Sequence, residues 1–161
     1  MAKISQTAIV GLSSRLLEEQ DALKSFVSLL ETEQQALLGG NPEQLLALSE
    51  NKMRAANELG KLAENHKNEL LAFGATNGVG GAKAWLQAHA ANLLPVWRNI
   101  QQLAGQAQQL NRINGVLIQT KLRHNQQALT ALQNAAHKTS GLYGPDGQPH
   151  LTSAGRVLGS V

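Results

Sequence analysis

Residues 92–137 read NLLPVWRNIQQLAGQAQQLNRINGVLIQTKLRHNQQALTALQNAAH, with no helix breaker after Pro95. Apolar residues recur at intervals of three and four along this stretch, which predicts one long amphipathic helix. Two earlier stretches with helical periodicity, about residues 5–38 and 42–73, are each shorter by roughly a dozen residues, or about 18 Å of helix. The sequence therefore predicts a last helix that outruns its covering helices and presents an apolar stripe to an external partner.

The two earlier stretches are expected to form an antiparallel hairpin. The first has a seam of apolar residues spaced by sevens, which suits packing against a partner helix: Ile9, Leu16, Leu23, Leu30 and Leu37. Between the stretches, Gly39 is expected to end the first helix in the left-handed conformation. Asn41 is then the expected N-cap of the second helix and Pro42 its first residue. Glu19 and Glu33 in the first helix, and Lys52 and His66 in the second, are polar interruptions of the seams.

Between the hairpin and the last helix, residues 74–81 read GATNGVGG, which is typical of a flexible loop. A short helix is expected over about residues 82–91, after which Asn92 is expected to cap the last helix. The loop superficially resembles a phosphate-binding loop. However, it lacks the Gly-Lys-Ser/Thr ending and no predicted strand precedes it, so we interpret it as a linker.

The apolar pattern of the last helix shifts near residue 114. The earlier seam comprises Leu93, Val96, Ile100, Leu103, Ala107 and Leu110. The shifted seam contains the four candidate binding residues, Ile118, Leu122, Leu129 and Leu132. The shift indicates either a different neighbour for the distal part or a local relaxation of the supercoil. The stripe is thus expected to bind an amphipathic helix of another protein, to pair with a second copy of the chain in a homodimer, or to be covered by the tail.

The predicted fold class is all-α: an elongated helical bundle made of an antiparallel coiled-coil hairpin and a long last helix. We expect residues 1–138 to form the bundle and residues 139–161, which hold five glycines and two prolines, to form a flexible tail. The chain of 161 residues has no cysteine, and no stretch approaches the roughly 20 apolar residues of a membrane span. A cytoplasmic location without membrane insertion is expected.

Enzymatic chemistry has no support in the sequence. The five histidines, at positions 66, 89, 124, 137 and 150, never pair at the i, i+4 spacing of a helical metal site. No serine has a nearby base, and the carboxylates show no acid–base pairing. We expect no catalytic residue, no metal and no cofactor.

Charge is divided unevenly along the chain. Residues 1–69 contain ten acids and seven bases, whereas residues 70–161 contain one acid and seven bases. One interpretation is attraction between acidic and basic helices within one bundle; another is a basic face for an acidic partner. Binding of nucleic acid is not expected, because the bases are sparse and few aromatic residues lie among them.

Two segments, LNRINGVLI at residues 110–118 and GLYGPDGQ at residues 141–148, carry a resemblance to a known family. Together with the order and lengths of the predicted helices, they resemble the FlgN family of flagellar type III export chaperones. The resemblance implies binding of the amphipathic C-terminal region of the hook-filament junction proteins, hook-associated proteins 1 and 3. It also implies delivery of these clients to the flagellar export gate, with Tyr143 in gate docking; the other interpretation of Tyr143 is a ring that pins the tail to the bundle. The alternative function is a self-assembling structural coiled-coil scaffold.

Overall fold

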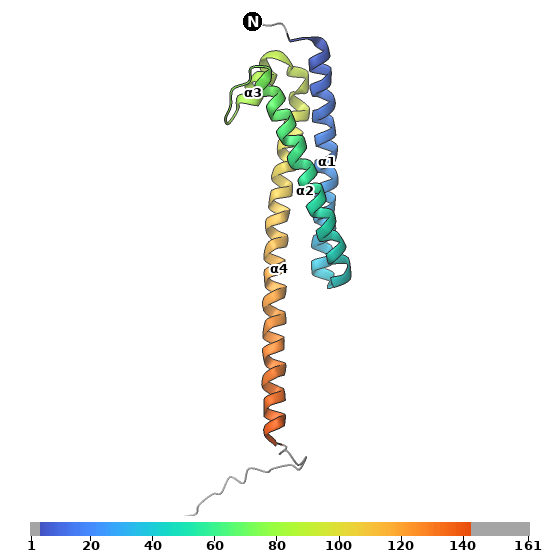
Figure 1. The fold of residues 1–161 in the computed structure, drawn as a ribbon, viewed down its shortest axis with the longest axis vertical. Coiled ribbons are helices and arrows are strands. Elements are labelled where there is room, and N and C mark those ends of the chain that lie inside the picture. Colours follow the sequence, from blue (N-terminus) through green and yellow to red (C-terminus); the bar gives the residue numbers. More distant parts are fainter. Residues whose placement is uncertain (1–3, 143–161) are drawn as a thin grey trace, which may run out of the picture. The chain divides into compact units, whose positions relative to one another are not determined.

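The computed structural model describes residues 4–142 and is all-α over this range, as predicted (Figure 1). These residues contain four α-helices and one 3-10 helix, joined by short non-helical segments: α1 (Gln6–Gly39), α2 (Pro42–Ala72), α3 (Gly81–His89), η1 (Ala91–Leu93) and α4 (Leu94–Leu142). The chain divides into two compact units, residues 1–118 and residues 119–161, each described by itself below. The predicted division into residues 1–138 and 139–161 stays a prediction, and the residues after Leu142 lie outside the described part.

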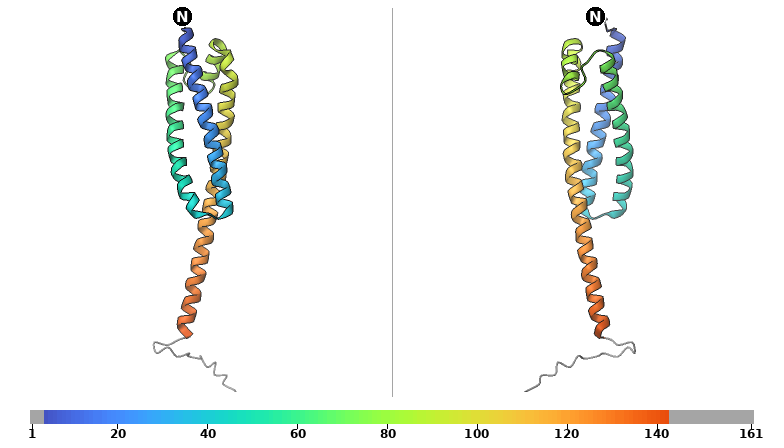
Figure 2. Two further views of the ribbon diagram at one scale, coloured as in Figure 1. Left: turned by 90° about the vertical axis from the view of Figure 1, so that its right-hand side faces the viewer. Right: turned by 60° about the vertical axis from the view of Figure 1, so that its left-hand side comes forward.

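The hairpin predicted from residues 5–73 is present, and α2 runs back alongside α1 (Figures 1 and 2). Ser5 caps α1, because its hydroxyl accepts a hydrogen bond from the Ala8 amide at 3.2 Å. Asn41 caps α2 as predicted, with its Oδ1 atom 3.3 Å from the Gln44 amide, and Pro42 begins the helix. The prediction for Gly39 is wrong. Gly39 is the last helical residue, and it is Gly40, at φ 73°, that takes the left-handed conformation.

The heptad seam of α1 faces the interior of the first unit. Four of its five members are buried, and Ile9 is half-buried: Leu16, Leu23, Leu30 and Leu37. Leu12, Leu16 and Leu23 pack in one core cluster with residues of the other helices, including Leu70, Trp85, Leu86 and Ile100. A second cluster joins Val27 and Leu30 of α1 to Ala107 of α4. Both clusters bury apolar surface, and the hydrophobic effect that results is the main force that stabilises this packing.

Glycines and one tryptophan determine the conformation of the segment between α2 and α4. Gly74, Gly78 and Gly80 all have positive φ, a conformation that residues with a side chain rarely adopt. Trp85 of α3 donates a hydrogen bond from Nε1 to the Phe73 carbonyl at 3.0 Å, which ties α3 to the end of α2. The helix α4 begins at Leu94, so Asn92 lies within η1 and does not occupy the predicted capping position.

The last helix is the longest in the described part of the chain, as expected. The helix α4 has 49 residues, against 34 in α1 and 31 in α2. Among the described residues, no helix combines the length and apolar character that crossing a bilayer requires.

Candidate functional site

The four candidate binding residues of α4 all expose much of their side chains. Their exposed fractions are 38% for Ile118, 63% for Leu122, 51% for Leu129 and 68% for Leu132. At 100° per residue, these positions lie within about 40° of one direction around the helix axis. Every residue from 122 to 139 is exposed. The site is therefore an apolar stripe along an otherwise polar length of helix, which we call the α4 stripe.

The earlier seam, which begins at Leu93 of η1 and continues along α4, has the opposite character. Leu93, Ile100 and Ala107 are buried, and Leu103 and Leu110 are half-buried. The shift in pattern predicted near residue 114 thus coincides with a change from buried to exposed apolar residues. Val116, at 56% exposure, adds a further exposed apolar side chain at this point.

Asn114 lies where the apolar residues of α4 change from buried to exposed, and its role was not predicted from the sequence. It is fully buried, and its Nδ2 atom donates to the Leu30 carbonyl at 2.8 Å and to Glu33 Oε1 at 2.9 Å. Lys52 of α2 donates to the same carboxylate oxygen at 3.1 Å. Three helices of the first unit therefore meet in one polar cluster, Glu33–Lys52–Asn114, in which Glu33 and Asn114 are buried and Lys52 is half-buried. The signal was present in the sequence, because Glu33 and Lys52 are the polar interruptions of their seams.

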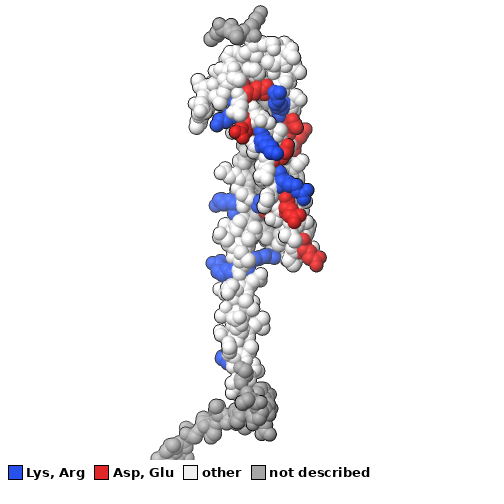
Figure 3. All heavy atoms as spheres, in the orientation of Figure 1, with Lys and Arg blue, Asp and Glu red and all other residues white. Residues whose placement is uncertain are grey.

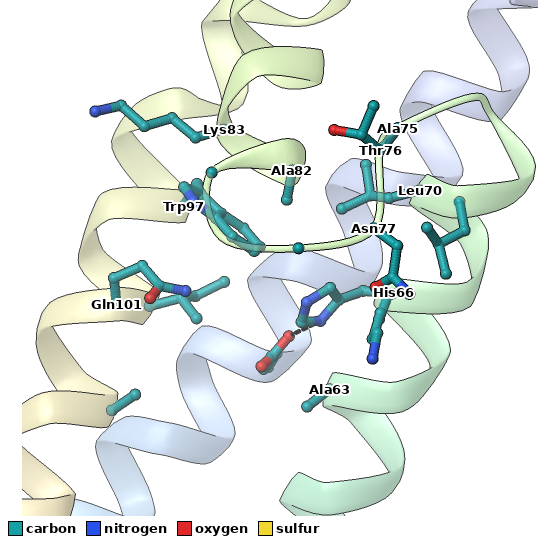
Figure 4. Close-up of a pocket in the computed structure, with 17 residues that line it drawn as sticks. Ala63, His66, Leu70, Ala75, Thr76, Asn77, Ala82, Lys83, Trp97 and Gln101 are labelled. Atoms are coloured by element: carbon teal, nitrogen blue, oxygen red, sulfur yellow. Dashed lines mark ion pairs between the residues drawn. The ribbon is translucent and has the colours of Figure 1, made fainter.

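A second buried polar pair lies nearer the loop. Glu19 of α1 contacts Nδ1 of His66 on α2, and both residues are buried (Figure 4). The ring of Trp97 meets the ring of His66 edge to face, with centroids 5.4 Å apart. Glu19 and His66 are thus the other two polar interruptions, and they pair with each other. Polar residues in the seams are matched across helices, which avoids the penalty of leaving a buried charge without a partner.

A cavity of about 590 Å³ lies beside this pair. Leu70, Trp97 and Ile100 line its apolar part, and loop residues from Ala75 to Gly80 form part of its wall (Figure 4). Its polar lining includes the Glu19–His66 pair together with Lys67 and Lys83. Among the described residues, no group of three or more metal-ligating side chains comes together. The cavity contains none of the predicted site residues.

The charge of the distal helix suits binding of a partner helix. Residues 115–142 include Lys121, Arg123 and Lys138 but no acid. Figure 3 shows acidic and basic side chains alternating along α2, whereas the distal part of α4 shows a few basic side chains and no acidic ones on this face. Asparagine and glutamine predominate among its polar residues, so hydrogen-bonding groups flank the stripe with little charge to desolvate. Tyr143, the predicted gate-docking residue, lies outside the described residues.

Comparison with known proteins identifies the family of the chain. Residues 8–150 match the protein family described as FlgN protein. The chain is also similar to the flagella synthesis protein FlgN of Yersinia enterocolitica, with 30% identity over 152 residues that cover 92% of this chain and 96% of that protein. No solved structure matches the chain.

Proposed function

Because the chain belongs to the FlgN family, we propose that it is a cytoplasmic export chaperone that binds the C-terminal amphipathic region of hook-associated proteins. Its role in flagellum synthesis as a chaperone follows from the family. The clients we propose are hook-associated proteins 1 and 3, which the chain would deliver to the flagellar type III export apparatus. Neither a metal nor a cofactor is part of the proposed activity.

One observation carries the proposal: the residues of the α4 stripe are apolar, lie on one side of the helix and are exposed. An amphipathic helix of a client buries its own apolar face when it lies against such a stripe. The burial of Leu122, Leu129 and Leu132 would supply most of the affinity, since a fully buried leucine is worth about 1.5–3 kcal/mol before entropic losses. Uncharged amides beside the stripe would fix the orientation of the client through hydrogen bonds.

Tyr143 is proposed as the contact with the export gate, because it follows directly after the described end of α4. Replacing Tyr143 with alanine is expected to reduce export of the client while leaving client binding unchanged. Loss of client binding in this variant would contradict the separation of the two roles.

The binding experiment uses two stripe variants, Leu122→Glu and Leu129→Glu, and C-terminal fragments of hook-associated proteins 1 and 3. The wild-type chain is expected to elute with a fragment as a defined complex on a sizing column, and each variant is expected to elute alone. Because Leu122 and Leu129 are exposed, both variants should keep the helical circular dichroism of the wild type. The matched control is Leu17→Glu, which places the same charge on an exposed leucine of α1 and should still bind.

Three results would overturn the proposal. The first is client capture by the stripe variants at the wild-type level. The second is unfolding of these variants, which would make the leucines part of a core. The third is a wild-type chain that forms a stable oligomer and ignores both fragments, which is the behaviour of a structural scaffold.

A further inference from the structure

The cavity beside the Glu19–His66 pair has the size and lining of a binding site, and the proposed function makes no use of it. Its volume of about 590 Å³ lies within the range of about 300–1,000 Å³ that is typical of ligand sites. Residues of α1, α2, α4 and the loop after α2 line it, and Leu70, Trp97 and Ile100 supply much of the apolar surface. A mostly apolar lining with a few polar groups is the usual character of a binding cavity.

The loop after α2, which forms one wall of the cavity, is tied by backbone hydrogen bonds. The Ala75 amide donates to the Leu70 carbonyl at 2.9 Å, and the Gly81 amide donates to the Gly78 carbonyl at 3.3 Å. A Cβ atom on Gly81 would overlap the Thr76 carbonyl oxygen, so only glycine lets the loop close this tightly on the start of α3. A cavity whose wall is already in place is easier to occupy than one that must form on binding.

The exposed charged groups of the lining are basic. Lys67 of α2 and Lys83 of α3 both line the cavity and are exposed, and we call these two residues the basic rim. Figure 4 shows the Lys83 side chain directed away from His66. The acid of the lining, Glu19, is buried and contacts His66. Residues 76–118, which include most of the loop, α3 and the first part of α4, contain three bases and no acid.

The nearest acids of α2 lie outside the cavity. Neither Glu64 nor Glu69 lines it. Glu69 is moreover paired with Arg15 of α1. A carboxylate of a ligand would therefore meet the basic rim, and the attraction of opposite charges would favour an acidic ligand over a basic one.

Apolar surface continues outside the cavity. Val79 stands in the loop between Gly78 and Gly80, both of which line the cavity, and its side chain is fully exposed. A small molecule enclosed by the cavity has no need of this contact. A peptide segment extends beyond the cavity on both sides and can cover such a side chain, so the exposed valine favours a peptide as the ligand.

From these observations we propose that the cavity binds a segment of a partner protein in which apolar side chains are flanked by acidic residues. The apolar side chains occupy the cavity against Trp97 and Ile100, and the flanking carboxylates pair with the basic rim. Val79 contacts the part of the segment that stays outside. The cavity contains no residue of the α4 stripe, so this second docking site goes beyond the proposed function and does not depend on it.

The test titrates the full-length chain with two synthetic peptides, Glu-Glu-Leu-Phe-Leu-Glu-Glu and Lys-Lys-Leu-Phe-Leu-Lys-Lys, and follows the indole N–H signals by nuclear magnetic resonance. The acidic peptide is expected to shift the signal of Trp97, which lines the cavity. The signal of Trp85 should stay in place, because its Nε1 atom is bonded to the Phe73 carbonyl and the residue is buried outside the lining. The basic peptide, with the same apolar residues, is expected to bind at least tenfold more weakly.

Two variants test the two parts of the site, and each has a matched control. Ala104→Phe fills the cavity from an exposed position of its lining and should weaken binding of the acidic peptide at least tenfold. Lys67→Glu reverses a charge of the basic rim and should weaken the acidic peptide while strengthening the basic one. Ala47→Phe and Lys61→Glu make the same changes at exposed positions of α2 outside the lining and should bind like the wild type. All four should keep the circular dichroism of the wild type.

Four results would overturn the docking site. They are absence of binding by the acidic peptide, equal binding of the two peptides, unchanged affinity in Ala104→Phe, and unchanged affinity in Lys67→Glu. Binding of anilinonaphthalene sulfonate in the cavity without binding of the acidic peptide would also overturn it, and would make the cavity a site for small organic anions.

The α4 stripe variant separates this inference from the proposed function. Leu129→Glu should bind the acidic peptide like the wild type, because Leu129 does not line the cavity. Ala104→Phe should still capture the client fragment. Loss of peptide binding in Leu129→Glu would overturn the independence of the two sites, whereas a chain that binds the peptide and ignores the client would contradict only the proposed function.

Discussion

At the scale of single residues, the polar side chains that interrupt the apolar seams pair with one another between helices. Glu19, Glu33, Lys52 and His66 interrupt apolar patterns in the sequence, and the structure pairs them across helices. Asn114 is the exception that joins a third helix to one of these pairs. A buried polar contact of this kind fixes the register between helices, because sliding one helix leaves the polar groups without partners.

The first prediction concerns Asn114. Replacement with alanine removes both hydrogen bonds and leaves Glu33 buried with Lys52 alone. We expect a loss of about 1–3 kcal/mol in the free energy of unfolding, measured by urea denaturation. Asn111, exposed on the same helix, is the matched control, and its replacement with alanine should change stability by less than about 0.5 kcal/mol. Equal effects at the two positions would contradict the role of Asn114.

At the scale of the elements, the hairpin could be predicted from the sequence because the residues that determine it lie close together in the chain. Heptad spacing, Asn41 and Pro42 set the two helices and the turn within a few residues, and the structure confirms them. The position of the left-handed residue was wrong by one, since adjacent glycines offer the same conformational freedom and only the hydrogen-bonding geometry of the last turn decides between them. Gly40 is the residue whose amide reaches the Ala36 carbonyl.

Gly39 and Gly40 therefore form a matched pair for the second prediction. Gly40→Ala forces a residue with a side chain into positive φ and should lower the free energy of unfolding by about 1 kcal/mol. Gly39→Ala replaces a helical glycine with nothing near its Cβ position and should raise stability by up to about 1 kcal/mol. Thermal and urea denaturation measure both effects. The reverse order would show that Gly39 ends the helix after all.

Only part of the candidate site could be predicted from the sequence, again because only local patterns can be recognised there. The α4 stripe follows from periodicity within one helix, so its residues could be predicted from the sequence: Ile118, Leu122, Leu129 and Leu132. The structure leaves their side chains exposed, and their role in binding stays a prediction. The Glu33–Lys52–Asn114 cluster joins residues that are 81 positions apart in one of its contacts, and no local pattern reports such a meeting.

At the scale of the whole molecule, the residues that stabilise the fold and the exposed apolar stripe lie in different parts of the chain. Residues 1–118 contain the buried clusters that stabilise the fold. The described residues beyond Gln119 contribute helix and exposed side chains but no member of either core cluster. We expect a segment with so few packing contacts to have low local stability, which would let a bound partner order it further.

The most direct measurement is amide hydrogen exchange of the full-length chain with and without a C-terminal fragment of hook-associated protein 1 or 3. Amides of residues 118–136 should exchange rapidly in the free chain, since their helix has exposed side chains on every face after residue 122. Addition of the fragment should slow exchange there by at least tenfold and leave the hairpin amides unchanged. Slowed exchange in the hairpin alone, with the distal part of α4 unaffected, would contradict the claim that this stripe is where the client binds.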